Sequence, residues 1–296
     1  MERRTLIKNG IAVSSALILP SWLKPEIKMA PGSVVRVTGD SPYDITRRAI
    51  AEMGGMDKFV SRRDVVMIKP NIGWNRVPEQ AGTTNPEVVR ALVELAYTAG
   101  AKKVIVMDNT LHKAEDAYSR SGIQSAAGKA GAEVRFVDDN RLVAHDFKGK
   151  NIQKWPVFKD FLEADKFINA PILKHHGSAG LTVAMKNVFG ILGGNRGKLH
   201  RDMAVSIADM ANGFRQHLIV VDAYRVLMRN GPVGGRLSDV EFKKTVIAST
   251  NVMHADVAAA VLFGLDPREL EFLQAGFERK MGEIDPAKIV IRSVTA

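Results

Sequence analysis

Beyond residue 32 the chain alternates short apolar runs with longer amphipathic segments. An apolar run without polar alternation is typical of a strand buried on both faces, and such strands occur in parallel sheets covered by helices. The segment at residues 85–100 indicates a helix, because Asn85 can cap it, Pro86 suits its first turn and Gly100 can end it. The alternation predicts an α/β fold: a mostly parallel sheet with helices on both faces.

The same pattern continues to the end of the chain. We expect strands at residues 33–39, 64–70, 102–109, 132–139, 166–174, 217–223, 243–250 and 288–294. We expect helices at residues 45–55, 85–100, 115–130, 180–192, 200–215 and 251–265. A length of 296 residues suits one large domain or two small ones. We predict a single α/β domain at residues 32–296, and leave open a smaller lobe inserted between residues 141 and 217.

Charge and cysteine content limit the chemistry of the chain. Cysteine is absent, which excludes disulfides, thiolate zinc sites and iron–sulfur ligation by this chain. Of the net charge of +10, residues 1–31 contribute +3, from five Lys/Arg and two Asp/Glu. Residues 141–201 contribute +7, from eleven Lys/Arg and four Asp/Glu. A basic region suggests an anionic partner, and a solvated basic face is the alternative.

The N-terminus has the pattern of an export signal. Arg3, Arg4 and Lys8 precede an apolar segment at residues 11–19, which matches the charged and hydrophobic regions of a signal peptide. The sequence "RRTLIK" resembles the twin-arginine signal, although Glu2 stands where Ser or Thr is usual and no clear A-x-A cleavage site follows. We predict a signal at residues 1–31 that directs the protein through the twin-arginine export machinery to the periplasmic or cell-surface side. An uncleaved anchor and a cytoplasmic basic tail are the alternatives.

Two polar residues interrupt the apolar segment at residues 181–192. Lys186 and Asn187 lie among residues that are otherwise apolar or glycine, except for Thr182. On a helix, Thr182 and Lys186 would share a face. A buried ammonium needs an anionic partner, a depressed pKa or a path to solvent. Lys186 therefore either pairs with Asp108 or Asp222, faces a ligand, or extends to solvent.

Other candidate residues follow predicted strands or lie in glycine-rich loops. Ligands of open α/β sheets bind beyond the carboxyl ends of the strands. The residues at these ends are Lys69, Asn71, Asp108, Asn109, Lys174, His175, His176, Asp222, Thr250 and Asn251. The loop candidates are Thr83 and Thr84 before a helix, the basic segment 193–198 followed by His200, and Asn230 and Gly231. A metal site of three histidines, including His254, has no supporting spacing, so the metal content stays open.

Four segments together resemble a known family. They are "KPNIG…GTTNPEVVRALVELAYTAGAKKVIVMDN", "KHHGSAGLTVAMKNVFGILGG", "NGPVGG" and "STNVMHADVAAAVLFGLDP". Between residues 33 and 290 the chain resembles the domain of unknown function 362 family. The resemblance implies a single α/β domain and a shared site at Lys69, Asn71, Lys174, His175, Lys186, Asn187 and His200.

The chain departs from this family in three respects. Some relatives carry ferredoxin-like cysteine segments, a role that this cysteine-free chain does not inherit. Arg229 stands where the family often has an acid before Asn-Gly-Pro, and Asn251 stands where it often has Asp. Loss of both acids argues against a carboxylate-rich metal site and favours an anionic ligand.

These observations favour an exported α/β protein that binds, or acts on, a small anionic molecule. Lys174 and Lys186 would hold its charge, Asn71 and Asn187 would orient it, and His175 or His200 would serve as acid or base if there is chemistry. A non-catalytic carrier of a cofactor loaded before export is the alternative. A nucleic-acid-binding module comes third, because the basic segment has few interleaved aromatic residues. The cofactor and the oligomeric state stay open.

Overall fold

The computed structural model describes residues 32–296. The predicted twin-arginine signal at residues 1–31 lies outside the described residues. Within residues 32–296, no helix has both the length and the apolar character needed to cross a membrane.

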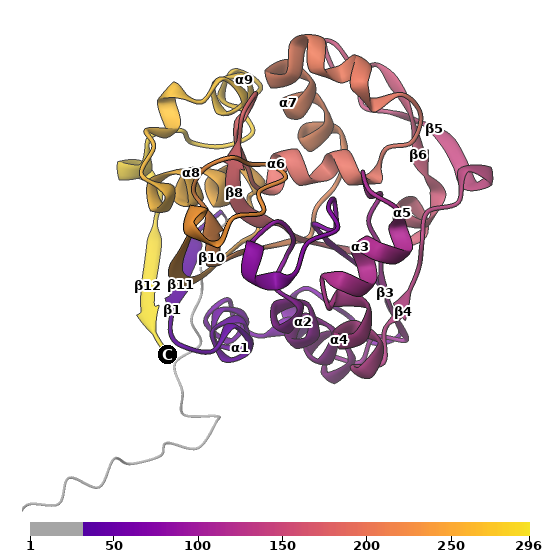
Figure 1. The fold of residues 1–296 in the computed structure, drawn as a ribbon, viewed down its shortest axis with the longest axis vertical. Coiled ribbons are helices and arrows are strands. Elements are labelled where there is room, and N and C mark those ends of the chain that lie inside the picture. Colours follow the sequence, from indigo (N-terminus) through magenta and orange to yellow (C-terminus); the bar gives the residue numbers. More distant parts are fainter. Residues whose placement is uncertain (1–31) are drawn as a thin grey trace, which may run out of the picture.

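A mixed, mostly parallel sheet of ten strands forms the centre of the molecule (Figure 1). Its main path runs β12-β1-β11-β10-β7-β2-β3-β4, with β8 paired to β10 and β9 paired to β8. The antiparallel neighbours are β1 with β11, β10 with β11, and β8 with β9. The strands are β1 Val34–Thr38, β2 Val65–Pro70, β3 Lys103–Val106, β4 Glu133–Val134, β7 Lys166–Ala170, β8 Ile172–His176, β9 Gly180–Thr182, β10 Leu218–Leu227, β11 Val240–Ser249 and β12 Ile291–Thr295.

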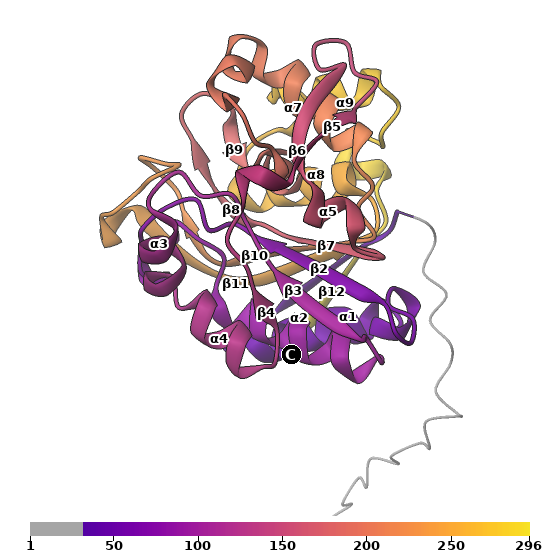
Figure 2. The same cartoon turned by 90° about the vertical axis from the view of Figure 1, so that its right-hand side faces the viewer.

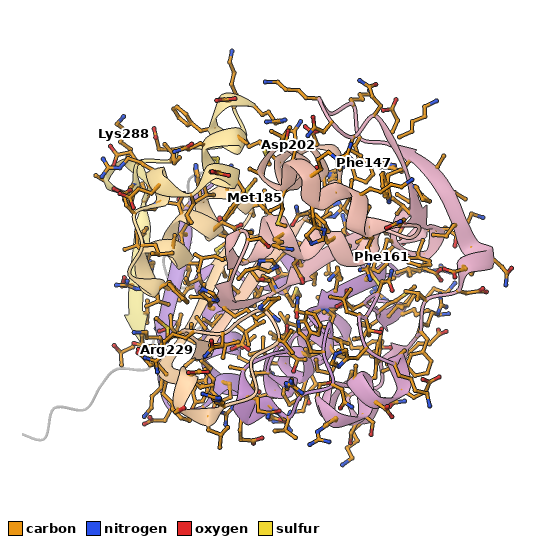
Figure 3. All side chains as sticks on the ribbon, turned by 45° about the horizontal axis from the view of Figure 1, so that its top comes forward. Phe147, Phe161, Met185, Asp202, Arg229 and Lys288 are labelled. Atoms are coloured by element: carbon orange, nitrogen blue, oxygen red, sulfur yellow. The ribbon has the colours of Figure 1, made fainter. Side chains whose placement is uncertain are left out.

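Helices cover both faces of this sheet (Figure 2). One apolar cluster joins the sheet to α1, α2, α3 and α4, and a second joins its other face to α5, α6, α7, α8 and α9. In the second layer, Phe147, Phe161 and Met185 are buried, whereas Arg229 and Lys288 lie at the periphery (Figure 3). The helices are α1 Pro42–Glu52, α2 Pro86–Thr98, α3 Ala114–Arg120, α4 Ile123–Lys129, α5 Lys159–Glu163, α6 Ala184–Asn187, α7 Met203–Gly213, α8 Val252–Phe263 and α9 Glu271–Glu278. The predicted fold class, a mostly parallel α/β sheet with helices on both faces, is confirmed.

Backbone constraints divide two of the predicted elements. The helix expected at residues 115–130 breaks at Gly122, whose φ of 73° is left-handed and separates α3 from α4. The strand expected at residues 166–174 is two strands, because Pro171 has no N–H to continue the ladder between β7 and β8. The strand expected at residues 132–139 is shorter than predicted and forms only the two-residue edge strand β4.

The prediction of a helix at residues 180–192 is wrong for its first residues. Residues 180–182 form β9, which pairs with β8 so that Thr182 lies opposite Lys174. The helix α6 then spans only Ala184–Asn187 and continues as the 3₁₀ helix η5, Val188–Ile191. Thr182 and Lys186 therefore do not share a helix face, although both line the same cavity.

A separate hairpin stands within residues 141–217. Strands β5 (Leu142–Asp146) and β6 (Lys154–Phe158) form a two-stranded sheet that is not part of the large one. It packs against the segment after η5, because the Trp155 indole donates to the carbonyl of Gly193 at 2.9 Å and the Gly193 amide donates to the carbonyl of Pro156. The same range also supplies β7 and β8 to the large sheet.

Candidate functional site

A cavity of about 360 Å³ opens at the carboxyl ends of β2, β3 and β8. Its walls also include α6, η5 and the start of the 3₁₀ helix η6, Arg196–Asp202. We call it the cationic cavity, because its lining includes Lys69, Lys174, Lys186 and Arg196 but only one carboxylate, Asp108. The other lining residues are Asn71, Gly73, Trp74, Asn109, Leu111, His176, Ser178, Thr182, Asn187, Phe189, Gly190, His200, Pro232 and Val233.

The single carboxylate is already paired. Lys69 Nζ lies 2.6 Å from Asp108 Oδ1, with the two side chains 1% and 3% exposed. The second oxygen of Asp108 accepts the Ile72 amide at 2.6 Å. Burial lowers the pKa of Lys69, and the Asp108 charge opposes that shift. The cavity therefore contains a neutralised pair together with three further basic side chains.

Gly190 makes room for this ion pair. A Cβ at position 190 would clash with Asp108 Oδ1 and lie 2.5 Å from Lys69 Nζ. The Gly190 carbonyl accepts the Asn109 amide at 3.1 Å. Close approach of η5 to the strand ends therefore requires a residue without a side chain.

Neutral oxygens hold Lys174. Its Nζ donates to Asn71 Oδ1 at 3.1 Å and to the Gly82 carbonyl at 2.5 Å. The side chain is buried, and burial together with the Lys186 charge lowers its pKa to about 7. No carboxylate within residues 32–296 pairs with it, so its positive charge is not cancelled.

A chain of side-chain amides runs from the Lys174 amine to the end of β7. Asn71 Nδ2 donates to Asn187 Oδ1 at 3.1 Å, and Asn187 Nδ2 donates to Asn169 Oδ1 at 2.8 Å. Asn169 Nδ2 in turn donates to the Ala184 carbonyl at 2.8 Å. Asn187 therefore fixes α6 to the ends of β2 and β7, besides lining the cavity.

A buried carboxylate fixes the start of α6. Asp256, in α8, accepts the amides of Ala184 and Met185 at 2.8 and 2.9 Å. Burial raises the pKa of Asp256 to about 7, against the effect of these two hydrogen bonds. The contact places the backbone of α6 so that Lys186 enters the cavity.

Lys186 has no hydrogen-bond or ion-pair partner among residues 32–296. Its Nζ lies 4.4 Å from the centre of the Phe189 ring. Burial, with a contribution from the Arg196 charge, lowers its pKa to about 8. The two carboxylates considered as partners are engaged elsewhere: Asp108 with Lys69, and Asp222 with the amides of Asn85 and Tyr224.

Arg196 and His176 also line the cavity, although neither was among the leading candidates from the sequence. Arg196 donates to the carbonyls of Asn109, Thr110 and Phe189, which fixes its guanidinium at the wall. Burial and the nearby lysines lower the pKa of His176 to about 3, so this imidazole is neutral. A signal for His176 existed, because alternate residues of a strand face the same side and Lys174 is two positions earlier.

The two histidines proposed as acid or base lie in different places. His200 lines the cavity at its exposed side, with its ring 6.1 Å from that of Phe189. His175 is not among the lining residues, and its Nδ1 accepts the Gly231 amide at 3.1 Å.

The remaining loop candidates do not line the cavity. Thr84 donates to the Ala170 carbonyl and accepts the Asn71 amide, and Thr83 is buried beside it. Asn230 donates to Asp239 at 2.7 Å. Gly231 packs against the backbone of His175, where a Cβ would clash. Thr84, Asn230 and Gly231 contact the backbone and side chains around the cavity, whereas the buried Thr83 hydroxyl has no hydrogen-bond partner among residues 32–296.

Neither of the two residues that replace a family acid lines the cavity. Arg229 is exposed and lies 3.4 Å from Asp239, and Asn251 caps α8. No group of three His, Cys, Asp or Glu residues that could hold a metal ion is found in residues 32–296. His254, the third histidine considered, instead contacts the Gly32 carbonyl and the Glu283 amide.

Comparison with known proteins assigns the family. The model of the family described as "Domain of unknown function (DUF362)" matches residues 66–261, more than half of the 296-residue chain. The chain belongs to this family. The DUF362 match covers all lining residues of the cationic cavity from Lys69 to Val233.

One curated protein and two solved structures are similar to this DUF362 chain in sequence or in fold. The Thylakoid-associated protein sll1697 of Synechocystis sp. is 24% identical over 237 residues, covering 77% of this chain and 72% of that protein. The lactate racemase apoprotein from Thermoanaerobacterium thermosaccharolyticum has a TM-score of 0.48 at 15% identity. A Thermotoga maritima protein has a TM-score of 0.44 at 11% identity. The chain spans 56% and 61% of the lengths of these two structures.

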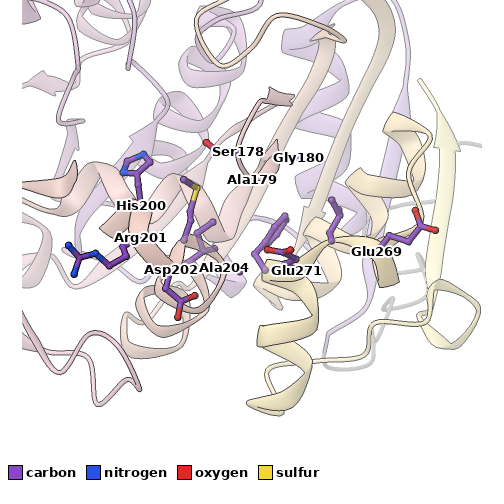
Figure 4. A pocket seen from close by; sticks show the side chains of 13 residues that line it. Ser178, Ala179, Gly180, His200, Arg201, Asp202, Ala204, Glu269 and Glu271 are labelled. Carbon is purple, nitrogen blue, oxygen red and sulfur yellow. The ribbon is translucent and has the colours of Figure 1, made fainter. Parts of the chain in front are cut away.

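A second cavity, of about 450 Å³, lies between the η6–α7 segment and the start of α9 (Figure 4). It shares Ser178 and His200 with the cationic cavity. Its charged lining residues are Arg201, Asp202, Glu269 and Glu271. With three carboxylates and one guanidinium, it lacks the cationic excess of the first cavity, so the cationic cavity is the better candidate for an anion.

Gly190→Ala tests the role of the buried ion pair. We expect the free energy of unfolding to fall by about 2–4 kcal/mol, because the new methyl group displaces Lys69 or Asp108. Gly128→Ala is the matched control, since Gly128 lies in α4 and a Cβ there meets nothing within 4 Å. The control should stabilise the protein by about 0.5–1 kcal/mol. Equal effects of the two changes in urea denaturation would contradict the close packing at Gly190.

Lys186→Met tests whether the lysine is a cost to the ligand-free fold. Its pKa falls from the reference value to about 8 in the folded state, so the unfolded chain binds the proton more tightly between about pH 8 and 10.5. The resulting penalty is complete below pH 8 and fades as the pH rises toward 10.5. Removing it should stabilise the ligand-free protein at pH 7 by on the order of 2 kcal/mol.

Denaturant unfolding of wild type and Lys186→Met at pH 7 and pH 10 measures this difference. The advantage of the variant should shrink at the higher pH. A variant that is several kcal/mol less stable at pH 7 would instead show that Lys186 balances a buried negative charge.

Proposed function

We propose that this protein binds a small anionic molecule in the cationic cavity. The observation that supports the proposal most directly is the excess of Lys69, Lys174, Lys186 and Arg196 over the one carboxylate, Asp108. An uncompensated buried cation is costly, and function often retains a residue that is unfavourable for stability. An anion placed among these groups would offset that cost.

The lining also suggests the character of the rest of the ligand. Trp74, Leu111, Phe189, Pro232 and Val233 add apolar surface to the polar groups. A volume of about 360 Å³ is within the range of small-molecule sites. The cavity therefore suits a compact carboxylate or phosphate compound with an apolar part.

The burial of the cations favours this proposal over a nucleic-acid module. Lys69 and Lys174 are each 1% exposed and Lys186 is 9% exposed. Counterion-releasing contacts to a nucleic-acid backbone need cations at the surface. Part of the positive charge of the segment at 141–201 is also offset by ion pairs. Arg141 pairs with Asp160, Lys159 with Glu163, and Lys166 with Asp64.

Catalysis and carriage are two forms of the same proposal. Lys186 and His200 line the cavity and are the residues available for proton transfer. His175 would act only through the Gly231 loop that it contacts. A carrier would need the cations alone, with the ligand acquired before export.

We also propose that export occurs by the twin-arginine route, on the pattern of Arg3, Arg4 and the apolar segment that follows. Export of a folded protein would allow a ligand to be bound before the protein leaves the cytoplasm.

Anion binding is tested by thermal unfolding with inorganic phosphate or a dicarboxylate. We expect the melting temperature to rise, because a ligand that binds the folded state stabilises it. The effect should be strong at pH 6.5 and weaken above pH 8, since Lys174 and Lys186 lose their charges near pH 7 and 8. Lys186→Met should reduce the affinity at least tenfold, because it removes a charged donor from a buried site.

Lys129→Met is the matched control, since Lys129 is exposed at the end of α4 and does not line the cavity. It should bind anions as the wild type does. Duplex DNA should not bind at physiological salt. Tight, salt-sensitive DNA binding without any effect of small anions would overturn the proposal.

Replacement of Arg3 and Arg4 by Lys tests the export route. The doubly substituted protein should accumulate in the cytoplasm, because the twin-arginine pair is the recognised feature of the signal. Cell fractionation followed by immunoblotting measures the distribution. A wild-type distribution of the variant would exclude twin-arginine export.

A further inference from the structure

Lys186 differs from the other cations of the cavity in having its amine unengaged. Lys69 Nζ is bound to Asp108 and to the Pro70 carbonyl, and Lys174 Nζ donates to two oxygens. Among residues 32–296, Lys186 Nζ has no hydrogen-bond or ion-pair partner, and it lies over the face of the Phe189 ring. Its amine is therefore available to a molecule in the cavity.

An available amine is a nucleophile only when it is neutral. A lysine reaches that state near neutral pH when it is desolvated or placed beside another cation. Lys186 meets both conditions, because it is 9% exposed and Arg196 lies on the same cavity wall. Its pKa of about 8 leaves about half of the amine neutral at pH 8, against a few per cent or less for a lysine with the reference pKa.

We propose that Lys186 forms an imine with a small aldehyde or 2-oxo compound that carries a carboxylate or phosphate group. This inference rests on the proposed function, because the same cations would hold the anionic group while the carbonyl carbon approaches Nζ. The apolar lining would accept the remainder of a compact substrate.

The step balances without an oxidant or a reductant. The lone pair of Lys186 Nζ attacks the carbonyl carbon, the nitrogen loses a proton while the carbonyl oxygen takes one up, and the product is a carbinolamine. Protonation of its hydroxyl group and loss of water then give the protonated imine, which is a cation and yields the neutral imine when it releases a proton. His200, which lines the same cavity, can pass a proton to the departing oxygen.

The surroundings of Lys186 separate two tasks. Lys174 and Arg196 are held by amide and carbonyl oxygens, so they keep their positions, and the Arg196 guanidinium offers a charge. Lys186 has no such restraint and its side chain lies on an aromatic ring. The hydrogen bonding thus identifies Lys186, rather than Lys174, as the amine that reacts.

Reductive trapping tests the proposal on the purified protein. Glyoxylate, an aldehyde with a carboxylate, is added with sodium cyanoborohydride, which reduces an imine to a stable amine. Peptide mass spectrometry then measures the rate of labelling at each lysine. We expect Lys186 to be labelled at least tenfold faster than the exposed Lys129, and inorganic phosphate to slow this labelling.

Two variants separate the imine from anion binding. Lys186→Arg keeps the positive charge but cannot form an imine, so it should retain stabilisation by phosphate and lose the fast label. Lys129→Met should keep both properties. Thermal unfolding of each variant, measured alongside, confirms that it is folded.

The failures are distinguishable. Labelling of Lys186 no faster than that of Lys129, with stabilisation by phosphate intact, would overturn the imine and leave the proposed function standing. Equal labelling by propionaldehyde, which has no charge, would overturn the anionic substrate class. Absence of stabilisation by phosphate, glyoxylate and dicarboxylates would overturn the proposed function itself.

Discussion

The buried ion pair between Lys69 and Asp108 is the constraint on which the cavity depends. It joins the ends of β2 and β3 at 2.6 Å, in a place where either charge alone would be strongly unfavourable. Asp108 is fixed further by the Ile72 amide. Because the pair leaves no space for a side chain, only glycine at position 190 allows η5 to pack there. The segment that presents Lys186 is thereby held against the strand ends.

The fold class could be predicted because it depends on local pattern. Apolar strands and capped helices such as residues 85–100 lead to an α/β sheet wherever the rest of the chain lies. The position of Lys186 at a cavity could also be predicted as one of three alternatives, since a lysine within an apolar segment needs an anionic partner, a ligand or a path to solvent. The strand β9 was missed, because a short apolar run does not distinguish helix from strand, and Gly180, with a φ of 73°, ends the preceding turn.

Other features of the cavity depend on contacts between distant residues. Asp256 fixes α6 from 72 positions away, and Asn71 meets Asn187 across 116 positions. Neither contact leaves a local signal, because an Asp in a helix or an Asn after a strand is common. The choice between His175 and His176 is different in kind. It follows from the alternation of side chains along β8, once Lys174 is placed in the cavity.

The polar groups around the lysines explain why their charge remains available. A carboxylate beside Lys174 would raise its pKa and cancel its charge, as Asp108 does for Lys69. Asn71 and the Gly82 carbonyl instead satisfy its hydrogen bonds and leave the net charge unchanged. The consequence is that the pKa values of Lys174 and Lys186 fall to about 7 and 8. An anion in the cavity would raise both pKa values again. The unfavourable free energy of the charged lysines would thereby be relieved on binding, which adds to the affinity.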